Sequence, residues 1–325
     1  MPEITDTPPP EIRAEHAALS AALTAGLPPK HVDNNLVIAS WNIRGFGDLT
    51  KKWTADPGDT PKRDLRSLLY ISEIVSRFDV IAIQEVKGNL RALRHMLRYL
   101  NRIDDVWSLI LTDETRGDAG NNERLAFVFD TRRVRLSGLA AELVVPTDGE
   151  ADLVAGFQNQ FARTPYAVAF KARGRTFILV TLHVLFGADA AGRIPELQAI
   201  AAWLRSWARE VNSYNQNLIT LGDFNLDLLG SQLANALFST GLAVPPELQT
   251  QDRTIFGAGS EVRHADQIAW FPGGEGTPGL SSLTYNHAAN VFNFEPLVLN
   301  GLGLTRMQKS FRVSDHLPLW AEFRT

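Results

Sequence analysis

Five short polar clusters, each at or near the end of an apolar run with β-strand composition, constrain the fold of this chain more than any other feature. The clusters are Trp41-Asn42, Gln84-Glu85, Thr181-Leu182-His183, Gly222-Asp223-Phe224-Asn225 and Ser314-Asp315-His316. Open sheets present the ends of their strands to ligands, so the side chains at these ends can share one cleft. The clusters therefore predict a single site assembled from strands in both halves of the chain.

Helix and strand patterns alternate between these clusters. Apolar stripes predict helices at about residues 62–77, 90–100 and 195–211. Strand patterns occur at residues 36–39, 79–83, 125–129, 167–172, 177–182, 218–221, 267–271 and 317–323. Neighbouring β runs between residues 124 and 182 indicate antiparallel hairpins, whereas helices separate other strands. This mixture favours a two-layered α/β sandwich over a purely parallel sheet.

The length of 325 residues would allow two domains, but site residues spread from 42 to 316 argue for one domain, residues 35–325. In this prediction residues 1–34 are an N-terminal extension with one candidate helix, Glu11 to Ala25, between proline-rich segments. A weakly ordered, partly disordered extension is favoured here over a partner-binding helix.

Composition excludes several classes of protein. The chain has no cysteine, which rules out disulfides and thiolate metal sites. No apolar run approaches the ~18–20 residues of a membrane span. The N-terminal segment lacks the basic-then-apolar order of a signal peptide, so a cytoplasmic protein is expected. The net charge of −4 gives no global basic signal, so nucleic-acid binding would depend on local patches and metal.

The oxygen-bearing side chains of the clusters predict a hard-cation site. Asp223 and Asn225 project the same way from extended backbone, and a carboxylate with an amide suits hydrated Mg²⁺ or a phosphate oxygen. An Asx turn is the alternative for this pair. Glu85 follows the apolar run 80–83, and a metal ligand is favoured there over a structural ion pair. For Asn42, a ligand and a turn-forming asparagine both stay open.

Two histidines add acid–base chemistry to this site. Asp315 can ligate metal, while His316, with an ordinary pKa of about 6.5, can carry protons at neutral pH. His183 alone would more often be structural, but two strand-end histidines with spare carboxylates favour catalysis. The spare carboxylates are Glu123 and Asp266. A carboxylate bonded to one ring nitrogen fixes the tautomer and raises the basicity of the imidazole.

Taken together, these residues resemble the endonuclease/exonuclease/phosphatase superfamily over about residues 36–325, and within it the deoxyribonuclease I branch. The narrower similarity rests on Asn42-Ile43-Arg44, Gln84-Glu85-Val86, Glu123-Arg124, Phe161-Ala162-Arg163-Thr164-Pro165, Leu182-His183 and Phe292-Asn293-Phe294. Abasic-site nucleases of the superfamily usually have Tyr in place of His183. The inositol phosphatases carry a Cys-Asp-Arg-type motif where this chain has Ala265-Asp266-Gln267.

The resemblance implies a four-layered α/β sandwich, two packed mixed sheets flanked by helices, that hydrolyses DNA to 5′-phosphate and 3′-hydroxyl ends with Mg²⁺ or Mn²⁺. It implies metal ligation by Asn42, Glu85, Asp315, Asp223 and Asn225. It places Asp223 and Asn225 beside the phosphate as well, and it makes His183, oriented by Glu123, and His316, oriented by Asp266, the acid–base pair. Double-stranded DNA is the expected partner, contacted by Arg163, Lys87 and Arg44.

The sequence departs from this branch at two DNA contacts. Asn121-Asn122 replace an aromatic groove contact expected just before Glu123, and Lys87 replaces an arginine that reaches into the minor groove. These departures concern DNA affinity rather than hydrolysis.

Two alternatives stay open. One is a phosphatase or lipid phosphodiesterase, acting on phosphoinositide or sphingomyelin, because fold does not fix substrate. The cationic residues Arg163, Lys87 and Arg44 favour a polyanion, and no hydrophobic hairpin indicates membrane docking. The other is an inactive binding module, which is disfavoured because every catalytic position is filled. A nuclease without an export signal would threaten its own genome, which leaves open substrate preference, an inhibitor or partner protein, or another export route.

Overall fold

The computed structural model describes residues 1–31, 34–115, 121–144, 161–185, 190–210, 217–226, 228, 230–257, 264–274 and 276–325. The helices are α1 (Pro10–Gly26), α2 (Leu65–Val75), α3 (Arg91–Leu100), α4 (Ala190–Arg209), α5 (Gln232–Phe238) and α6 (Arg306–Ser310), with short 3₁₀ turns at Pro246–Leu248, Glu295–Leu297 and Asn300–Leu302. The strands are β1 (Leu36–Phe46), β2 (Val80–Lys87), β3 (Trp107–Leu111), β4 (Glu123–Asp130), β5 (Arg135–Glu142), β6 (Tyr166–Ala172), β7 (Arg175–His183), β8 (Leu218–Asp223), β9 (Asp266–Trp270), β10 (Thr284–Val291) and β11 (Leu319–Arg324). None of the helices in these ranges is long and apolar enough to cross a membrane.

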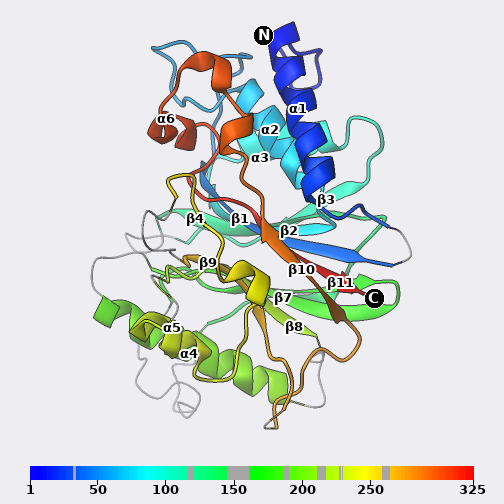
Figure 1. The fold of residues 1–325 in the computed structure, drawn as a ribbon, viewed down its shortest axis with the longest axis vertical. Coiled ribbons are helices and arrows are strands. Elements are labelled where there is room, and N and C mark those ends of the chain that lie inside the picture. The colour runs from blue at the N-terminus through cyan, green and yellow to red at the C-terminus, as the bar shows by residue number, and fades with distance from the viewer. Residues whose placement is uncertain are drawn as a thin grey trace.

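The strands form two mixed sheets that pack face to face. The six-stranded sheet has the order β10-β11-β1-β2-β4-β3, and the five-stranded sheet has the order β5-β6-β7-β8-β9. Helices α1, α2 and α3 cover the outer face of the first sheet, and α4 and α5 cover the outer face of the second (Figure 1). The predicted four-layered α/β sandwich is therefore confirmed.

Aromatic side chains from both sheets fill the space between them. Phe127 of β4 lies with its ring centroid 5.4 Å from that of Phe170 on β6, which in turn lies 5.9 Å from Phe177 on β7. All three side chains are fully buried. Strands covered on both faces read as continuous apolar runs, which is why the central strands were predictable.

Three strands were not predicted, and all three lie at sheet edges. These are β3, β5 and β10. Solvent reaches many residues of β5 and β10, so their sequences carry less apolar signal; in β5 every second residue is exposed and none is fully buried. Strand β3 is instead a short, mainly apolar run of five residues, which periodicity alone does not distinguish from a helix segment. The helix predicted at 195–211 begins earlier, at Ala190, and ends at Arg209, while Val211 lies outside the described residues.

The N-terminal segment differs from the weakly ordered extension that was expected. Helix α1 packs on α2, and its Ile12, Leu19 and Leu23 are buried in the same apolar cluster as the first sheet. Glu15 accepts hydrogen bonds from Arg66 and Tyr70 of α2. Burial of the three apolar side chains stabilises α1 on the sheet layer, although the proline-rich flanking segments had suggested a weakly ordered extension. The division of the chain at residues 34 and 35 stays a prediction.

An ion-pair cluster fastens α1 to α2, and its loss should be visible as a pH-dependent change in stability. Glu73 lies 3.1 Å from His16 Nε2 and 2.6 Å from Arg77 Nη2. Burial alone would raise the pKa of Glu73, but His16 and Arg77 lower it to about 2. We expect Glu73→Gln to lower the free energy of unfolding by about 2 kcal/mol at neutral pH.

The sign of the pH dependence follows from the lowered pKa. A carboxylate with a depressed folded-state pKa stabilises the fold above its ordinary value of 4.5, and this contribution is lost as pH falls towards 2. In urea titrations over that range, the gap between Glu73→Gln and the wild type should therefore close. The exposed Glu11→Gln is the matched control on α1. A gap that stays constant with pH would contradict this assignment.

Candidate active site

Strand pairing brings the predicted residues to one end of the sandwich. Parallel pairing places Asn42 beside Gln84 and, in the other sheet, His183 beside Asp223. Antiparallel pairing adds Asp266 beside Asp223. In the first sheet it likewise sets Glu123, at the start of β4, beside Lys87 at the end of β2. Asn42 Nδ2 lies 3.0 Å from Asp223 Oδ2 and His183 Nδ1 lies 3.0 Å from Glu123 Oε2, so strand ends from both sheets meet, as the five clusters predicted.

Gly222 allows β7 and β8 to approach closely just before the site. Its φ is +145°, and a Cβ atom there would lie 2.1 Å from the carbonyl oxygen of Leu182. That distance is far inside van der Waals contact with backbone, which cannot move aside. The glycine therefore sets the position of Asp223 relative to His183.

We expect Gly222→Ala to lower the free energy of unfolding by about 3 kcal/mol, because the clash would force the paired strands apart. Gly241→Ala is the matched control. Its φ is +97°, but a Cβ atom at this position would have no atom within 4 Å, so the alanine variant should lose only the backbone strain of about 1 kcal/mol. Equal losses for the two variants in urea denaturation would contradict the close-approach argument.

Each of the two histidines lies against its own carboxylate. Nδ1 of His183 is 3.0 Å from Glu123 Oε2, and Nδ1 of His316 is 2.7 Å from Asp266 Oδ2. The histidines and the carboxylates are nearly or fully buried, apart from a 15% exposed side chain at His316. This contact favours the tautomer with the proton on Nδ1, which leaves Nε2 to exchange protons with a ligand.

Asp223 lies between the two imidazoles. Its Oδ2 is 3.7 Å from Nε2 of His183 and 3.9 Å from Nε2 of His316. Burial would raise the pKa of Asp223, but the two histidines lower it. Burial opposes a charged ring at His316 as well, yet the charges of Asp266, Asp223 and Asp315 raise the pKa of His316 well above its ordinary value. Nε2 of both rings therefore lies beside the same carboxylate oxygen, Oδ2 of Asp223.

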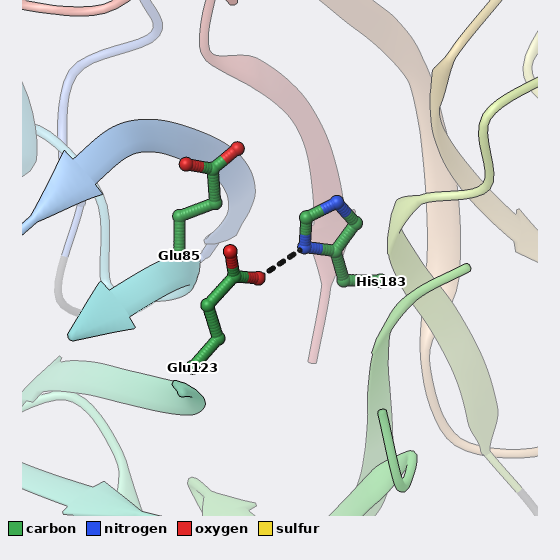
Figure 2. Close-up of side chains that lie close together, drawn as sticks. All are labelled: Glu85, Glu123 and His183. Atoms are coloured by element: carbon green, nitrogen blue, oxygen red, sulfur yellow. Dashed lines mark ion pairs between the residues drawn. The ribbon is translucent and has the colours of Figure 1, made fainter. Parts of the chain in front are cut away.

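A second group of converging side chains lies beside His183. Glu85, Glu123 and His183 each direct a ligand atom to within 4.8 Å of the others, and they come from β2, β4 and β7 (Figure 2). Burial would raise the pKa of Glu123, but His183, Arg163 and Lys87 lower it to about 2. Glu85 accepts a hydrogen bond from the Gly45 backbone at 2.8 Å. Two carboxylates that converge with an imidazole are a donor set that can hold a divalent cation.

Asn42 offers a further candidate cation ligand at this end of the sandwich, its side-chain oxygen. Its Nδ2 donates to Asp223 Oδ2 at 3.0 Å, while its Oδ1 is buried and has no hydrogen-bond partner among the described residues. A buried carbonyl oxygen without a donor is a destabilising feature that a cation would relieve. Asn225 donates through Nδ2 to the carbonyl oxygen of Val184 and through its backbone N–H to Asp223. The roles of Asn42 and Asn225 in metal binding stay predictions.

Asp315 is at the site but outside the two convergent groups. Its Oδ2 accepts from Arg44 Nη1 at 3.3 Å, and its side chain is 24% exposed. Arg44 also donates to Ser310 and lies over the ring of Phe311. Metal ligation by Asp315 and substrate binding by Arg44 therefore remain predictions.

Two of the predicted DNA contacts lie against Glu123. Lys87 Nζ donates to Glu123 Oε1 at 2.8 Å and to the backbone oxygen of Asn121 at 3.1 Å. Arg163 is 7% exposed, with its Nε 2.6 Å from Glu123 Oε2. Its Nη1 is buried without a hydrogen-bond partner among the described residues. Both cations thus position the carboxylate that contacts His183.

Sequence reasoning missed the residue that holds the loops around the site together. Arg63 is buried and donates to the backbone oxygens of Arg44, Gly45, Arg312 and Val313. Burial lowers its pKa to about 10. A lone arginine in a loop carries no pattern that would distinguish it from a solvated charge. The hydrogen bond that Gln84 donates across the sheets to Thr181, 2.9 Å long, was not predicted either, although both residues belong to the predicted clusters.

With the fold and the geometry of the site described, comparison with known sequences gives the family of this chain. The pattern of the Endonuclease/Exonuclease/phosphatase family matches residues 39–316, and this chain belongs to that family. Within the family it is similar to deoxyribonuclease I.

Two relatives show this similarity in sequence, and a solved structure shows it in fold. A "Deoxyribonuclease" from Thioalkalivibrio sp. (strain K90mix) is 29% identical over 210 residues, which are 63% of this chain and 50% of the relative. Deoxyribonuclease-1 of Bos taurus is 28% identical over 216 residues, 65% of each chain. The match thus spans less than two thirds of either relative. The structure of D. rerio TDP2 complexed with single strand DNA product has a TM-score of 0.53 at 16% identity, covering 90% of this chain and 100% of that one.

Proposed function

We propose that this chain is a divalent-metal-dependent endodeoxyribonuclease that hydrolyses double-stranded DNA to 5′-phosphate and 3′-hydroxyl ends. The observation that carries the proposal is the pair of imidazoles around Asp223, at 3.7 and 3.9 Å, each with its Nδ1 against a carboxylate. Phosphodiester hydrolysis needs one proton removed from water and one delivered to the leaving oxygen. Relatives named deoxyribonucleases support DNA as the substrate.

The two histidines would serve the two ends of this reaction. Nε2 of one imidazole accepts the proton of the water whose oxygen bonds to phosphorus. Nε2 of the other donates a proton to O3′ as the bond from phosphorus to O3′ breaks. Glu123 and Asp266 hold the rings through Nδ1 and stabilise each imidazolium without becoming protonated themselves. Each proton transfer contributes typically ~10²–10⁴ in rate.

Oxygen ligands around Glu85 and Asn42 fit a hard divalent cation, Mg²⁺ or Mn²⁺. When bound, such an ion supplies charge neutralisation at the non-bridging phosphate oxygens. Glu85 and the free Oδ1 of Asn42 would hold it, with Asp223 close by through its hydrogen bond to Asn42. The amide of Asn42 would in addition keep Asp223 turned towards the two imidazoles.

A variant of Arg163 tests whether this side chain, besides contacting Glu123, also contacts the DNA backbone. Each phosphate contact on duplex DNA contributes about −0.9 to the slope of log K against log[salt], independent of base sequence. If the unpaired Nη1 of Arg163 binds phosphate, Arg163→Ala should flatten this slope by about one unit and weaken binding to all sequences alike. An unchanged slope with lower turnover would mean that Arg163 acts only through Glu123.

A panel of substrates tests the proposed function against its rivals. The purified protein with Mg²⁺ or Mn²⁺ would be assayed on duplex DNA, RNA, a phosphoinositide, sphingomyelin and a small phosphomonoester, and kcat/KM compared. We expect duplex DNA to give the highest value. A higher value for the lipid or the monoester would replace the nuclease with a phosphatase or lipid phosphodiesterase. Activity on none of them would leave a binding module.

A further inference from the structure

A basic hollow of about 510 Å³ lies in the surface formed by the start of β5 and the hairpin between β6 and β7. Its charged side chains are Arg132, Arg133, Arg135, Lys171 and Arg173, and no Asp or Glu side chain lines it. Thr325 reaches it from the end of β11, which in Figure 1 lies beside the green hairpin. In a chain with a net charge of −4, this is a local concentration of positive charge.

The basic hollow is at the opposite end of the strands from the active site. Leu36 lines the hollow at the start of β1, and Asn42 follows six residues later at the active-site end. Likewise Gly174 lines the hollow just before β7 begins, and His183 ends that strand. At about 3.3 Å per residue, these runs separate the two places by roughly 20 to 30 Å. A phosphate in the hollow is therefore not the one being hydrolysed.

Four of the five cations of the hollow fall into two pairs. Arg132 and Arg133 are paired at 2.8 Å with the buried carboxylates of Asp130 and Asp79. Arg135 and Lys171, both exposed, have no carboxylate within ion-pair distance in the described part of the chain. The register sets these two directly opposite one another on adjacent strands. Like charges in directly opposed positions destabilise a sheet, and an anion between them would remove this repulsion.

We propose that the basic hollow is an exosite for the phosphate backbone of nucleic acid, binding a segment of the polymer other than the one at the active site. This inference rests on the proposed nuclease function, since a nuclease substrate is long enough to reach both places. Duplex DNA carries one negative charge per about 1.7 Å of its axis, so one segment presents several phosphates to Arg135 and Lys171. Such contacts carry no base specificity. They keep a long substrate on the protein between cleavage events.

The experiment compares the wild type with Arg135→Gln/Lys171→Gln in binding a long linear duplex, in EDTA so that no hydrolysis occurs. Removing two phosphate contacts should flatten the slope of log K against log[salt] by roughly 1.8, from about 0.9 per contact. Between 50 and 200 mM salt the variant should then lose roughly tenfold less affinity than the wild type loses. The exposed arginines Arg13 and Arg94, changed together to Gln, are the control with the same loss of charge, and should leave the slope unchanged.

Inorganic tripolyphosphate and thermal unfolding complete the test. The wild type should bind tripolyphosphate, and both Arg135→Gln/Lys171→Gln and Arg135→Glu should bind it several-fold more weakly. Both variants should unfold at the same temperature as the wild type or higher, because the like-charge pair is gone. Unchanged tripolyphosphate binding overturns the site. Weaker tripolyphosphate binding with an unchanged DNA slope overturns the nucleic-acid assignment and leaves a small polyphosphate as the ligand. Because none of these readouts depends on hydrolysis, the proposed function can fail separately.

Discussion

Replacing His316 or His183 with alanine is expected to lower turnover on DNA by at least ~10²-fold in each case. The reason is the geometry around Asp223, where each Nε2 lies beside the Asp223 carboxylate and each Nδ1 lies against a carboxylate of its own. Glu123→Gln and Asp266→Asn should cost less, since these carboxylates orient the rings without transferring protons. The measurement is kcat on duplex DNA at saturating metal and substrate.

His31→Ala supplies the control for this comparison, because His31 is exposed and precedes the start of β1, the end of that strand opposite to Asn42. It should turn over at the wild-type rate. Wild-type turnover in His183→Ala would make that residue a core histidine, and the mechanism would lose one of its two proton carriers.

Removing divalent metal is expected to abolish hydrolysis, by roughly 10³-fold or more, because a cation at the phosphate is worth several kcal/mol of transition-state stabilisation. The all-oxygen donors near the site and the unpaired Oδ1 of Asn42 are the structural basis. Activity should return with Mg²⁺ or Mn²⁺, and Asn42→Ala should need more metal for half-maximal activity.

The metal requirement is compared with that of a control variant away from the site. Asn101→Ala changes an asparagine that bonds the backbone near Trp107, away from the site, and should leave the metal requirement unchanged. Full activity in excess EDTA would contradict metal dependence outright. An unaltered metal requirement in Asn42→Ala would remove that residue from the ligand set.

The parts of the fold that were predictable are the parts buried on both faces. Strands β1, β2, β7 and β8 read as apolar runs, and α2 and α3 as amphipathic stripes, because burial dictates their composition. The edge strands β5 and β10 were missed because solvent covers much of their surface, and β3 was missed because it is a short run of five residues. The docking of α1 was missed because its Ile12, Leu19 and Leu23 are spaced too widely among alanines and polar residues to give a strong stripe.

The site shows a similar division. Polar residues at the ends of apolar strands were recognisable, and the structure places Glu123 against His183 and Asp266 against His316, pairings that the family resemblance implied. The ion-pair and hydrogen-bond partners of the long cationic side chains could not be predicted from the sequence. Lys87 and Arg163 both contact Glu123, because a buried carboxylate attracts any cation within reach, and their contacts with DNA stay predictions. Among the residues that the structure describes, Arg63 donates its hydrogen bonds to backbone oxygens, and no residue pattern encodes such contacts.

Incubating the wild-type protein with supercoiled plasmid and Mg²⁺, followed by DNA ligase, tests the central claim most directly. The account predicts metal-dependent nicking that is lost in His316→Ala, with nicks that ligase seals without further treatment because they carry 5′-phosphate and 3′-hydroxyl ends. Absence of nicking with either Mg²⁺ or Mn²⁺, or nicks that ligase seals only after a 3′-phosphate is removed, would contradict it.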